Sequence, residues 1–330
     1  MKKLLIILDG LMEEYFEDKD LGSMVLGPLS NCFRVNRVNY SVPGYDVDSL
    51  NCIMNILGYS PKRYNLSDRA YYEGLSRGIE NYKLIMRCNV VRIEKGVLVD
   101  FAGGNLPHNI SNIVEGFKIE SGRVHSCIGY KNLITLDNDE GVQGEGLCPP
   151  HFNIGNNVID IMPRDSRLKA IVEESKGYFN SIGLNGLALW PWGIAQKPDN
   201  LGNHNDTGII SGIDLVHGIG IHLGMDSVKP IGATGDVDTD LSAKLIATLS
   251  SIKNNNRTIL HVNGLDEVAH RRDLQGKLEL VSRLQRDLIT PLIENGLREN
   301  IDIIITSDHR TDSKTGEHNN GYVQYFSKEK

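Results

Sequence analysis

The chain of 330 residues is long enough to bury a large core and to form about two domains. Its hydrophobic content of 40% and charged content of 23% are typical of globular proteins, and a net charge of -7 argues against a general nucleic-acid binder, which needs a basic surface. Its 5 scattered cysteines lack a CxxC pair, which disfavours a disulfide framework and favours a reducing compartment. We therefore expect a cytoplasmic protein.

Short apolar strands and helices alternate at the start of the chain. Residues 3–8 predict a buried strand rather than a signal peptide, because Asp9 stands where a small-residue cleavage site would lie. No apolar run approaches the ~20 residues of a membrane span. Apolar residues repeat at helical spacing over residues 49–57, and residues 68–80 predict a further helix.

Ser49 lies in or near the first turn of its predicted helix. A hydroxyl there faces unpaired backbone N–H groups and the positive end of the helix dipole, so an incoming phosphoryl group would be held beside it. Coordination to a metal could activate this serine as a nucleophile. Simple capping of the helix by Asp48 or Ser49 explains the same residues, so this stretch leaves both interpretations open.

The pattern of predicted elements changes over residues 85–165. Strand-like runs alternate there with Gly- and Asn-rich turns, and residues 111–119 predict a short helix. This pattern predicts an α+β module. Because helix–strand alternation flanks it on both sides, we interpret the module as an insertion into a main domain formed by residues 1–84 and 166–330.

The alternation resumes after Pro163. Helices are predicted over residues 165–182, 208–225 and 241–251, and strands at residues 186–193, 258–264 and 301–309. Such alternation implies an α/β fold with a mostly parallel sheet covered by helices on both faces.

Charged side chains follow three of the apolar runs and form one candidate set: Asp9, Asp266, His270, Asp308, His309 and His318. Asp266 and His270 are four residues apart, which places them on one face of a helix. Parallel sheets bind ligands at their carboxyl edge, where these residues would meet. Mixed carboxylate and imidazole ligands suit Zn, Mn or Fe better than Ca. With Ser49 the set is too large for one ion, and two metals about 4 Å apart suit in-line phosphoryl displacement.

Taken in order, the motifs resemble the archaeal-type, cofactor-independent phosphoglycerate mutases of the alkaline phosphatase superfamily. The matching segments are ILDG at 7–10, Ser49 with LGYSP at 57–61, MRCNVV at 86–91, GYKNLITL at 129–136, PPHFNIG at 149–155, LWPWG at 189–193, ISGIDLVHGIG at 210–220, GATGDVDTD at 232–240, DEVAH at 266–270 and SDH at 307–309.

The resemblance implies an alkaline-phosphatase-like fold whose inserted module closes over the substrate and excludes water. It also implies one metal held by Asp266, His270 and His318, and another held by Asp9, Ser49, Asp308 and His309. Manganese is the usual metal of that family and zinc is common in the superfamily. Ser49 would form a phosphoserine during interconversion of 2-phosphoglycerate and 3-phosphoglycerate.

The expected substrate clamp departs from the family. Its GRG-P-LEA segment is replaced by LSDRAYYEG, leaving Arg69 as a remnant, and its Tyr-Arg-His becomes Tyr130-Lys131-Asn132. Lysine lacks the two-pronged fork with which arginine holds carboxylate or phosphate. The candidates for binding substrate are Arg87, Lys131, His151, Arg69 and Lys197, although surface charge explains any one of them equally well.

With the resemblance, the sequence therefore predicts a metal-dependent phosphomutase that acts on a small phosphorylated metabolite with Mn²⁺ or Zn²⁺ as cofactor. Phosphoglycerate is the expected substrate, and the altered clamp leaves a different substrate as an alternative. A phosphatase or phosphonate-pathway hydrolase with the same metal centre is the alternative. A non-catalytic binding protein with a decayed site is disfavoured because the ligand set is complete. No nucleic acid or membrane partner is expected, and no oligomeric state is predicted.

Overall fold

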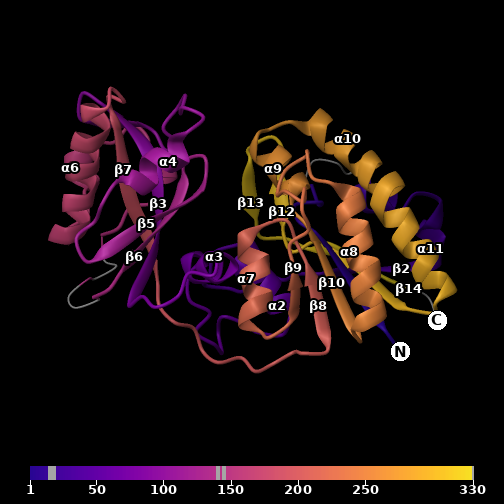
Figure 1. The fold of residues 1–330 in the computed structure, drawn as a ribbon. Coiled ribbons are helices and arrows are strands. Elements are labelled where there is room, and N and C mark those ends of the chain that lie inside the picture. Colours follow the sequence, from indigo (N-terminus) through magenta and orange to yellow (C-terminus); the bar gives the residue numbers. More distant parts are fainter. Residues whose placement is uncertain (14–19, 139–141, 143–145, 329–330) are drawn as a thin grey trace. The chain divides into compact units, whose positions relative to one another are not determined.

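The chain forms two compact units (Figure 1). Unit 1 combines Met1–Leu66 with Pro198–Lys330, and unit 2 is Ser67–Lys197. The computed structural model describes residues 1–13, 20–138, 142 and 146–328. Within these parts of the chain, no helix has the length and apolar character that crossing a membrane requires.

Unit 1 is built on a seven-stranded sheet. The strands, in their order across it, are β2 (Phe33–Val38), β14 (Val323–Lys328), β11 (Asp302–Thr306), β1 (Lys3–Leu8), β10 (Arg257–Val262), β8 (Thr207–Ile210) and β9 (Asp226–Val228). The five strands from β11 to β9 are parallel, whereas β14 and β2 pair antiparallel. The carboxyl ends of β11, β1 and β10 therefore meet at one edge.

The remaining elements of unit 1 connect these strands. They are α1 (Leu21–Leu26), the 3-10 helix η1 (Gly27–Cys32), α2 (Ser49–Ile56), α7 (Asp214–His222), α8 (Leu241–Asn254), α9 (Gly264–His270), α10 (Leu274–Leu284), the π-helical turn η3 (Gln285–Ile289), α11 (Thr290–Arg298), and a hairpin of β12 (Arg310–Asp312) and β13 (Glu317–Asn319).

Helices cover both faces of the sheet, as predicted. On one face, Ile6 of β1 and Leu260 of β10 belong to a buried apolar cluster with Leu284 of α10. On the other face α7 approaches so closely that a Cβ added at Gly220 would lie 2.3 Å from Ile209 Cγ2. Glycine is therefore needed where α7 crosses β8.

Two parts of unit 1 differ from the sequence prediction. The predicted helix over 208–225 is a strand, β8, followed by α7, because residues 207–210 are fully enclosed between β10 and β9. No element was predicted for residues 274–298, which form consecutive helical segments. Pro291 near the start of α11 has no N–H for the helical bond, and the π-helical turn η3 lies directly before that segment.

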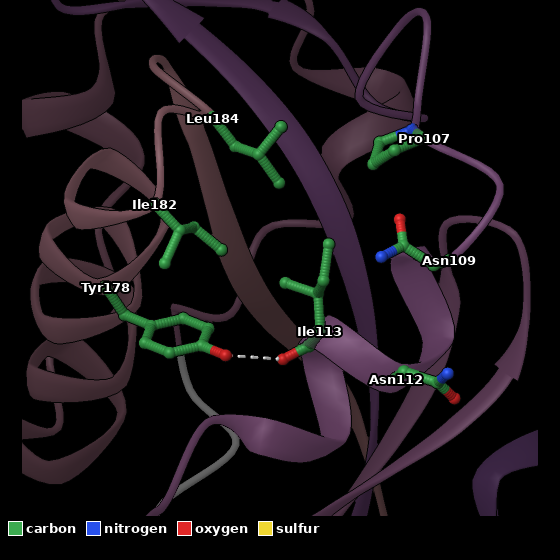
Figure 2. A pocket seen from close by; sticks show the side chains of 7 residues that line it. All are labelled: Pro107, Asn109, Asn112, Ile113, Tyr178, Ile182 and Leu184. Atoms are coloured by element: carbon green, nitrogen blue, oxygen red, sulfur yellow. Dashed lines mark hydrogen bonds between the residues drawn. The ribbon is translucent and has the colours of Figure 1, made fainter.

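Unit 2 has an antiparallel sheet in the order β4-β3-β6-β5, with β7 also paired to β3. Its elements are α3 (Arg69–Ser76), β3 (Leu84–Glu94), β4 (Val97–Asp100), α4 (Ile110–Gly116), β5 (Gly122–Ile128), β6 (Lys131–Leu136), the 3-10 helix η2 (Pro150–Phe152), α5 (Val158–Ile161), α6 (Ser166–Ser181) and β7 (Leu187–Ala195). Figure 2 shows how Tyr178 of α6 donates a hydrogen bond to the Ile113 carbonyl of α4, at 2.9 Å.

The second unit is wider than the predicted insertion of residues 85–165. Strand β7, which was assigned to the main domain, pairs with β3 from Ile85 to Arg92. Helix α3 belongs here as well, because Ala70 packs against Ile85 and Leu133 of this sheet. The bounds 1–84 and 166–330 for the main domain were therefore too generous on both sides of the insertion.

The packing of β10 makes a first prediction. Leu260→Ala removes a fully buried side chain from the unit 1 core and should lower the free energy of unfolding by about 2–5 kcal/mol. Because Trp190 and Trp192 both lie in unit 2, hydrogen exchange of the β10 amides is the appropriate measurement. The control is Ile246→Ala on the exposed side of α8, which should change this free energy by no more than about 0.5 kcal/mol. Equal effects of the two substitutions would contradict the assigned core.

Candidate metal centre

Three neighbouring strand ends deliver the carboxylates of the predicted site. Asp9 directly follows β1, Asp308 follows β11 after one residue, and Asp266 lies in the first turn of α9 just beyond β10. Gly10 lets the end of β1 approach α9, because an added Cβ would lie 2.6 Å from Asp266 Cα and its φ of 69° is left-handed. The parallel register therefore brings three acidic side chains together.

The first ligand group consists of Asp266, His270 and His318. His270 lies one helical turn after Asp266, and its Nε2 is 3.1 Å from Asp266 Oδ2. Strand β13 places His318 Nε2 at 3.3 Å from Asp266 Oδ1 and 3.1 Å from His270 Nε2. One donor atom from each residue thus faces a common point.

The second ligand group consists of Asp9, Ser49, Asp308 and His309. The Ser49 hydroxyl donates to Asp9 Oδ2 at 3.2 Å, and its oxygen is 3.4 Å from His309 Nε2. The same His309 nitrogen is 3.3 Å from Asp308 Oδ2 and 3.4 Å from Asp9 Oδ1. All seven predicted residues therefore converge in unit 1, in the two groups that the resemblance implied.

Hydrogen bonds to backbone carbonyls orient the two imidazoles of the first group. His270 Nδ1 is 2.7 Å from the Gly316 carbonyl, and His318 Nδ1 is 2.7 Å from the Val47 carbonyl. A carbonyl oxygen only accepts, so each Nδ1 carries the proton. When the imidazole is neutral, the lone pair is therefore on Nε2, which is the tautomer that a metal ligand at this nitrogen requires.

Thr311 links the two groups and was not predicted. Its hydroxyl donates to Asp266 Oδ1 at 2.6 Å, so its oxygen accepts the Nδ1–H of His309 at 3.2 Å. This leaves the His309 Nε2 lone pair facing the second group. Thr311 lies opposite His318 in the β12–β13 hairpin, a pairing that residue spacing in the sequence does not reveal.

The buried acidic charge fits a divalent cation. Asp9, Asp266 and Asp308 are 0%, 6% and 1% exposed. Burial raises the pKa of Asp9 well above its ordinary value, and the neighbouring charges of Asp308 and Asp266 raise it further. Among the described residues, Asp9 Oδ1 and both Asp308 carboxylate oxygens have no hydrogen-bond partner. Such oxygens are costly to bury unless a cation compensates them, so this donor set is suited to divalent metal binding.

The structure shows which residue caps the helix that begins at Ser49. Asp48 is the N-cap of α2, and its carboxylate accepts the Asn51 N–H at 2.7 Å. Ser49 is the first helical residue and is 5% exposed, with its hydroxyl directed to Asp9. Capping therefore uses Asp48 and leaves the Ser49 hydroxyl available to the site.

His261 of β10 is a further residue that sequence reasoning missed. It is fully buried, and its Nε2 lies 3.3 Å from Asp9 Oδ2. Burial, followed by the charge of Lys244, lowers the pKa of His261 to about 3, so the imidazole is neutral. The alternation of side chains along the strands could have indicated this position. His261 pairs with Ile7 of β1, and Asp9, two residues after Ile7, is on the same face of the sheet.

Three of the predicted substrate-binding residues gather in unit 2. Both Arg87 and Arg69 form an ion pair with Glu73. Arg87 Nε lies 3.2 Å from Glu73 Oε2, and Arg69 Nε lies 3.6 Å from Glu73 Oε1. The Arg87 guanidinium also lies 4.5 Å from the centre of the Trp192 ring, whose other neighbour is the His151 ring at 5.2 Å. Burial lowers the pKa of His151, and the charges of Arg87 and Arg69 lower it further.

Lys131 and Lys197 are less closely tied to this cluster. The Lys131 ammonium lies 5.7 Å from the centre of the Tyr130 ring, and that ring contacts Phe101. Lys197 is exposed two residues after the end of β7, and no hydrogen bond or ion pair in the described part of the chain joins it to the cluster. Asn132 points to the opposite side of β6, where it is buried and donates to the Tyr130 carbonyl.

Two family models match adjoining parts of the chain. Residues 34–182 match the model of the 2,3-bisphosphoglycerate-independent phosphoglycerate mutases, and residues 195–327 match that of the Metalloenzyme superfamily. The first match covers most of unit 2, and the second contains five of the seven converging residues.

Curated relatives and solved structures agree with these models. The 2,3-bisphosphoglycerate-independent phosphoglycerate mutases of Methanosarcina acetivorans and Methanosarcina mazei are 28% and 29% identical, each over 82% of this chain and 73% of the relative. A protein from Pyrococcus horikoshii has a TM-score of 0.74 at 20% identity, covering 99% of this chain and 87% of that one. The cofactor-independent phosphoglycerate mutase from Thermoplasma acidophilum has a TM-score of 0.61 at 18% identity, covering 99% and 89%. These structures share the fold.

The first ligand group predicts how metal affinity depends on pH. A hydrogen bond that His270 donates to the Asp266 carboxylate raises the pKa of His270 to about 8, so in the metal-free protein this imidazole is protonated below that pH. A cation must displace the proton, so the apparent affinity for Mn²⁺ should fall about tenfold per pH unit between pH 8 and pH 6. Competition titration against a chelator measures this slope. His270→Asn should reduce the slope, and an affinity independent of pH would contradict the assignment.

Proposed function

We propose that this chain, whose adjoining segments match the models of the 2,3-bisphosphoglycerate-independent phosphoglycerate mutases and of the Metalloenzyme superfamily, transfers a phosphoryl group through Ser49 at a two-metal centre. The substrate class is a small phosphorylated metabolite, as for the named relatives, with interconversion of 2-phosphoglycerate and 3-phosphoglycerate as the reaction. The single observation that carries the proposal is the Ser49 hydroxyl between Asp9 and His309, at the first residue of α2.

Each ligand group would hold one cation. Asp266, His270 and His318 would bind the first, and Asp9, Ser49, Asp308 and His309 would bind the second. We propose Mn²⁺ or Zn²⁺, because three imidazole nitrogens among carboxylate oxygens suit these ions better than Ca²⁺ or Mg²⁺. When bound, the cations would offset the phosphoryl charge and favour the ionised serine.

The chain's own groups define the course of the transfer. The Ser49 proton lies on the hydrogen bond to Asp9 Oδ2 and would leave in that direction as Oγ attacks phosphorus. The bond from phosphorus to the substrate oxygen breaks, and that oxygen takes up a proton to become a hydroxyl. Reversal with the neighbouring hydroxyl of the same molecule would return the phosphoryl group to the second position and regenerate Ser49.

Unit 2 would supply the groups that hold the rest of the substrate. Arg87 is the strongest candidate, because Glu73 and the Trp192 ring fix its guanidinium in place. Arg69 and His151 would add positive charge or hydrogen bonds beside it. Since Lys131 stands where the family has arginine, another phosphorylated or phosphonate metabolite is the alternative substrate.

An NMR assay tests this function directly. Manganese-loaded protein is incubated with 3-phosphoglycerate, and the metal is removed before the spectra are recorded. We expect 2-phosphoglycerate to form without release of free phosphate. Release of phosphate would instead favour a phosphatase with the same centre. If neither 2-phosphoglycerate nor free phosphate forms, phosphoglycerate is excluded as the substrate.

A substitution at Ser49 tests the covalent step. Ser49→Ala should abolish detectable turnover, because the phosphoryl acceptor is lost, while the ion at Asp266, His270 and His318 should remain bound. Turnover and metal content per chain are the two measurements. The parallel variant Ser307→Ala removes a neighbouring buried hydroxyl that donates to the His309 carbonyl, and it should keep turnover. Near-normal turnover in Ser49→Ala would exclude the phosphoserine mechanism.

A further inference from the structure

The two oxygens of Asp9 have different surroundings, and the difference originates behind the ligands. Asp9 Oδ2 lies within hydrogen-bond distance of both the Ser49 hydroxyl, at 3.2 Å, and His261 Nε2, at 3.3 Å. Asp9 Oδ1 has no hydrogen-bond partner among the residues described. A carboxylate bonded in this way has one oxygen fixed by protein donors and one oxygen available to a cation.

Ser211 lies beside the second nitrogen of the His261 ring. The Ser211 oxygen accepts the Ile213 N–H at 3.2 Å, so its own proton is free to be donated. The neighbouring acceptor is His261 Nδ1, at 3.3 Å. With Nδ1 accepting, the neutral imidazole carries its proton on Nε2 and donates it to Asp9 Oδ2. The opposite tautomer would direct a lone pair at the carboxylate, which is repulsive.

The sheet itself provides this chain of hydrogen bonds. Ser211, His261 and Asp9 come from the adjacent strands β8, β10 and β1 at their carboxyl ends. All three lie on the sheet face opposite the cluster that contains Leu260 and Ile6. The buried ammonium of Lys244 donates to the His261 carbonyl at 3.0 Å and so fixes the backbone at the same point.

We propose that His261 is a positioning residue that holds Asp9 with Oδ1 directed to the second cation and Oδ2 to Ser49, and that Ser211 sets its tautomer. This inference rests on the proposed two-metal function. Hydrogen bonds behind a metal ligand fix its orientation, and their loss typically lowers metal affinity about 10–100-fold. The ring nitrogens of His261 lie within hydrogen-bond distance of Asp9 and Ser211, and Asp9 belongs to the second ligand group, so we expect the second cation to weaken and the first to keep its affinity.

Two amide substitutions separate the positioning role from simple burial. In His261→Gln the amide nitrogen reaches as far as Nε2 and can still donate to Asp9. In His261→Asn the amide reaches only as far as Nδ1, so the bond to Asp9 is lost. Both are polar and of similar size, and any general penalty for replacing a buried imidazole applies to both.

The experiment titrates metal-free protein with Mn²⁺ and follows free Mn²⁺ by electron paramagnetic resonance, without substrate. We expect two ions per chain in the parent and in His261→Gln. In His261→Asn we expect one ion of parent affinity and one that binds about 10–100-fold more weakly. Ser211→Ala should weaken the same ion to a smaller extent. The control is His125→Asn in unit 2, which loses a similar bond to the Thr135 hydroxyl and should bind both ions normally.

The outcomes separate the possible failures. Two ions of parent affinity in His261→Asn would overturn the positioning role while leaving the two-metal function intact. Equal loss of both ions, with a lower melting temperature of the metal-free protein, would also overturn it, because that result indicates a merely structural role. A parent protein that binds neither Mn²⁺ nor Zn²⁺ would overturn both the inference and the proposed function. If His261→Asn does not fold, Ser211→Ala gives the same test.

Discussion

The parallel pairing of β1 with β10 and β11 is the constraint on which the metal centre depends. It brings Asp9, Asp266 and Asp308 from three strand ends into one buried space, where their charges repel each other. That repulsion opposes folding, and packing elsewhere helps to offset it in the metal-free chain. The apolar face of the same sheet, with Ile6, Leu260 and Leu284, supplies this packing. The core and the site are thus two faces of one sheet.

The chemistry is divided between the two units in a simple way. Every residue of the two ligand groups lies in unit 1, and every candidate for binding substrate lies in unit 2. Unit 2 carries its guanidinium groups on an antiparallel sheet and a short helix, with Glu73 neutralising part of their charge. The proposed phosphoryl-transfer centre and the proposed substrate-binding residues can therefore change independently. This agrees with a chain in which the ligand groups match the family and the expected clamp does not.

The sequence predicted those parts of the molecule that depend on local pattern. Acidic residues directly after apolar strands predicted which carboxylates meet at the site. The four-residue spacing of Asp266 and His270 predicted that both lie on one face of a helix. The contribution of Thr311 depends on its pairing with His318 across a hairpin, and that of His261 on strand register, neither of which is local. The limits of unit 2 were misjudged for the same reason, because β7 joins that sheet through pairing with β3 across about a hundred residues of sequence.

The hairpin of β12 and β13 has a consequence for how the protein acquires its metal. His318 completes the first ligand group, whereas Asp9 stands near the start of the chain. During synthesis the ribosome must therefore release the chain as far as His318 before the first ligand group is complete. Until then the acids at the ends of β1 and β10 lack their partners. Metal loading is thus a late event that follows assembly of the sheet, and an ion cannot act as the nucleus around which the chain begins to fold.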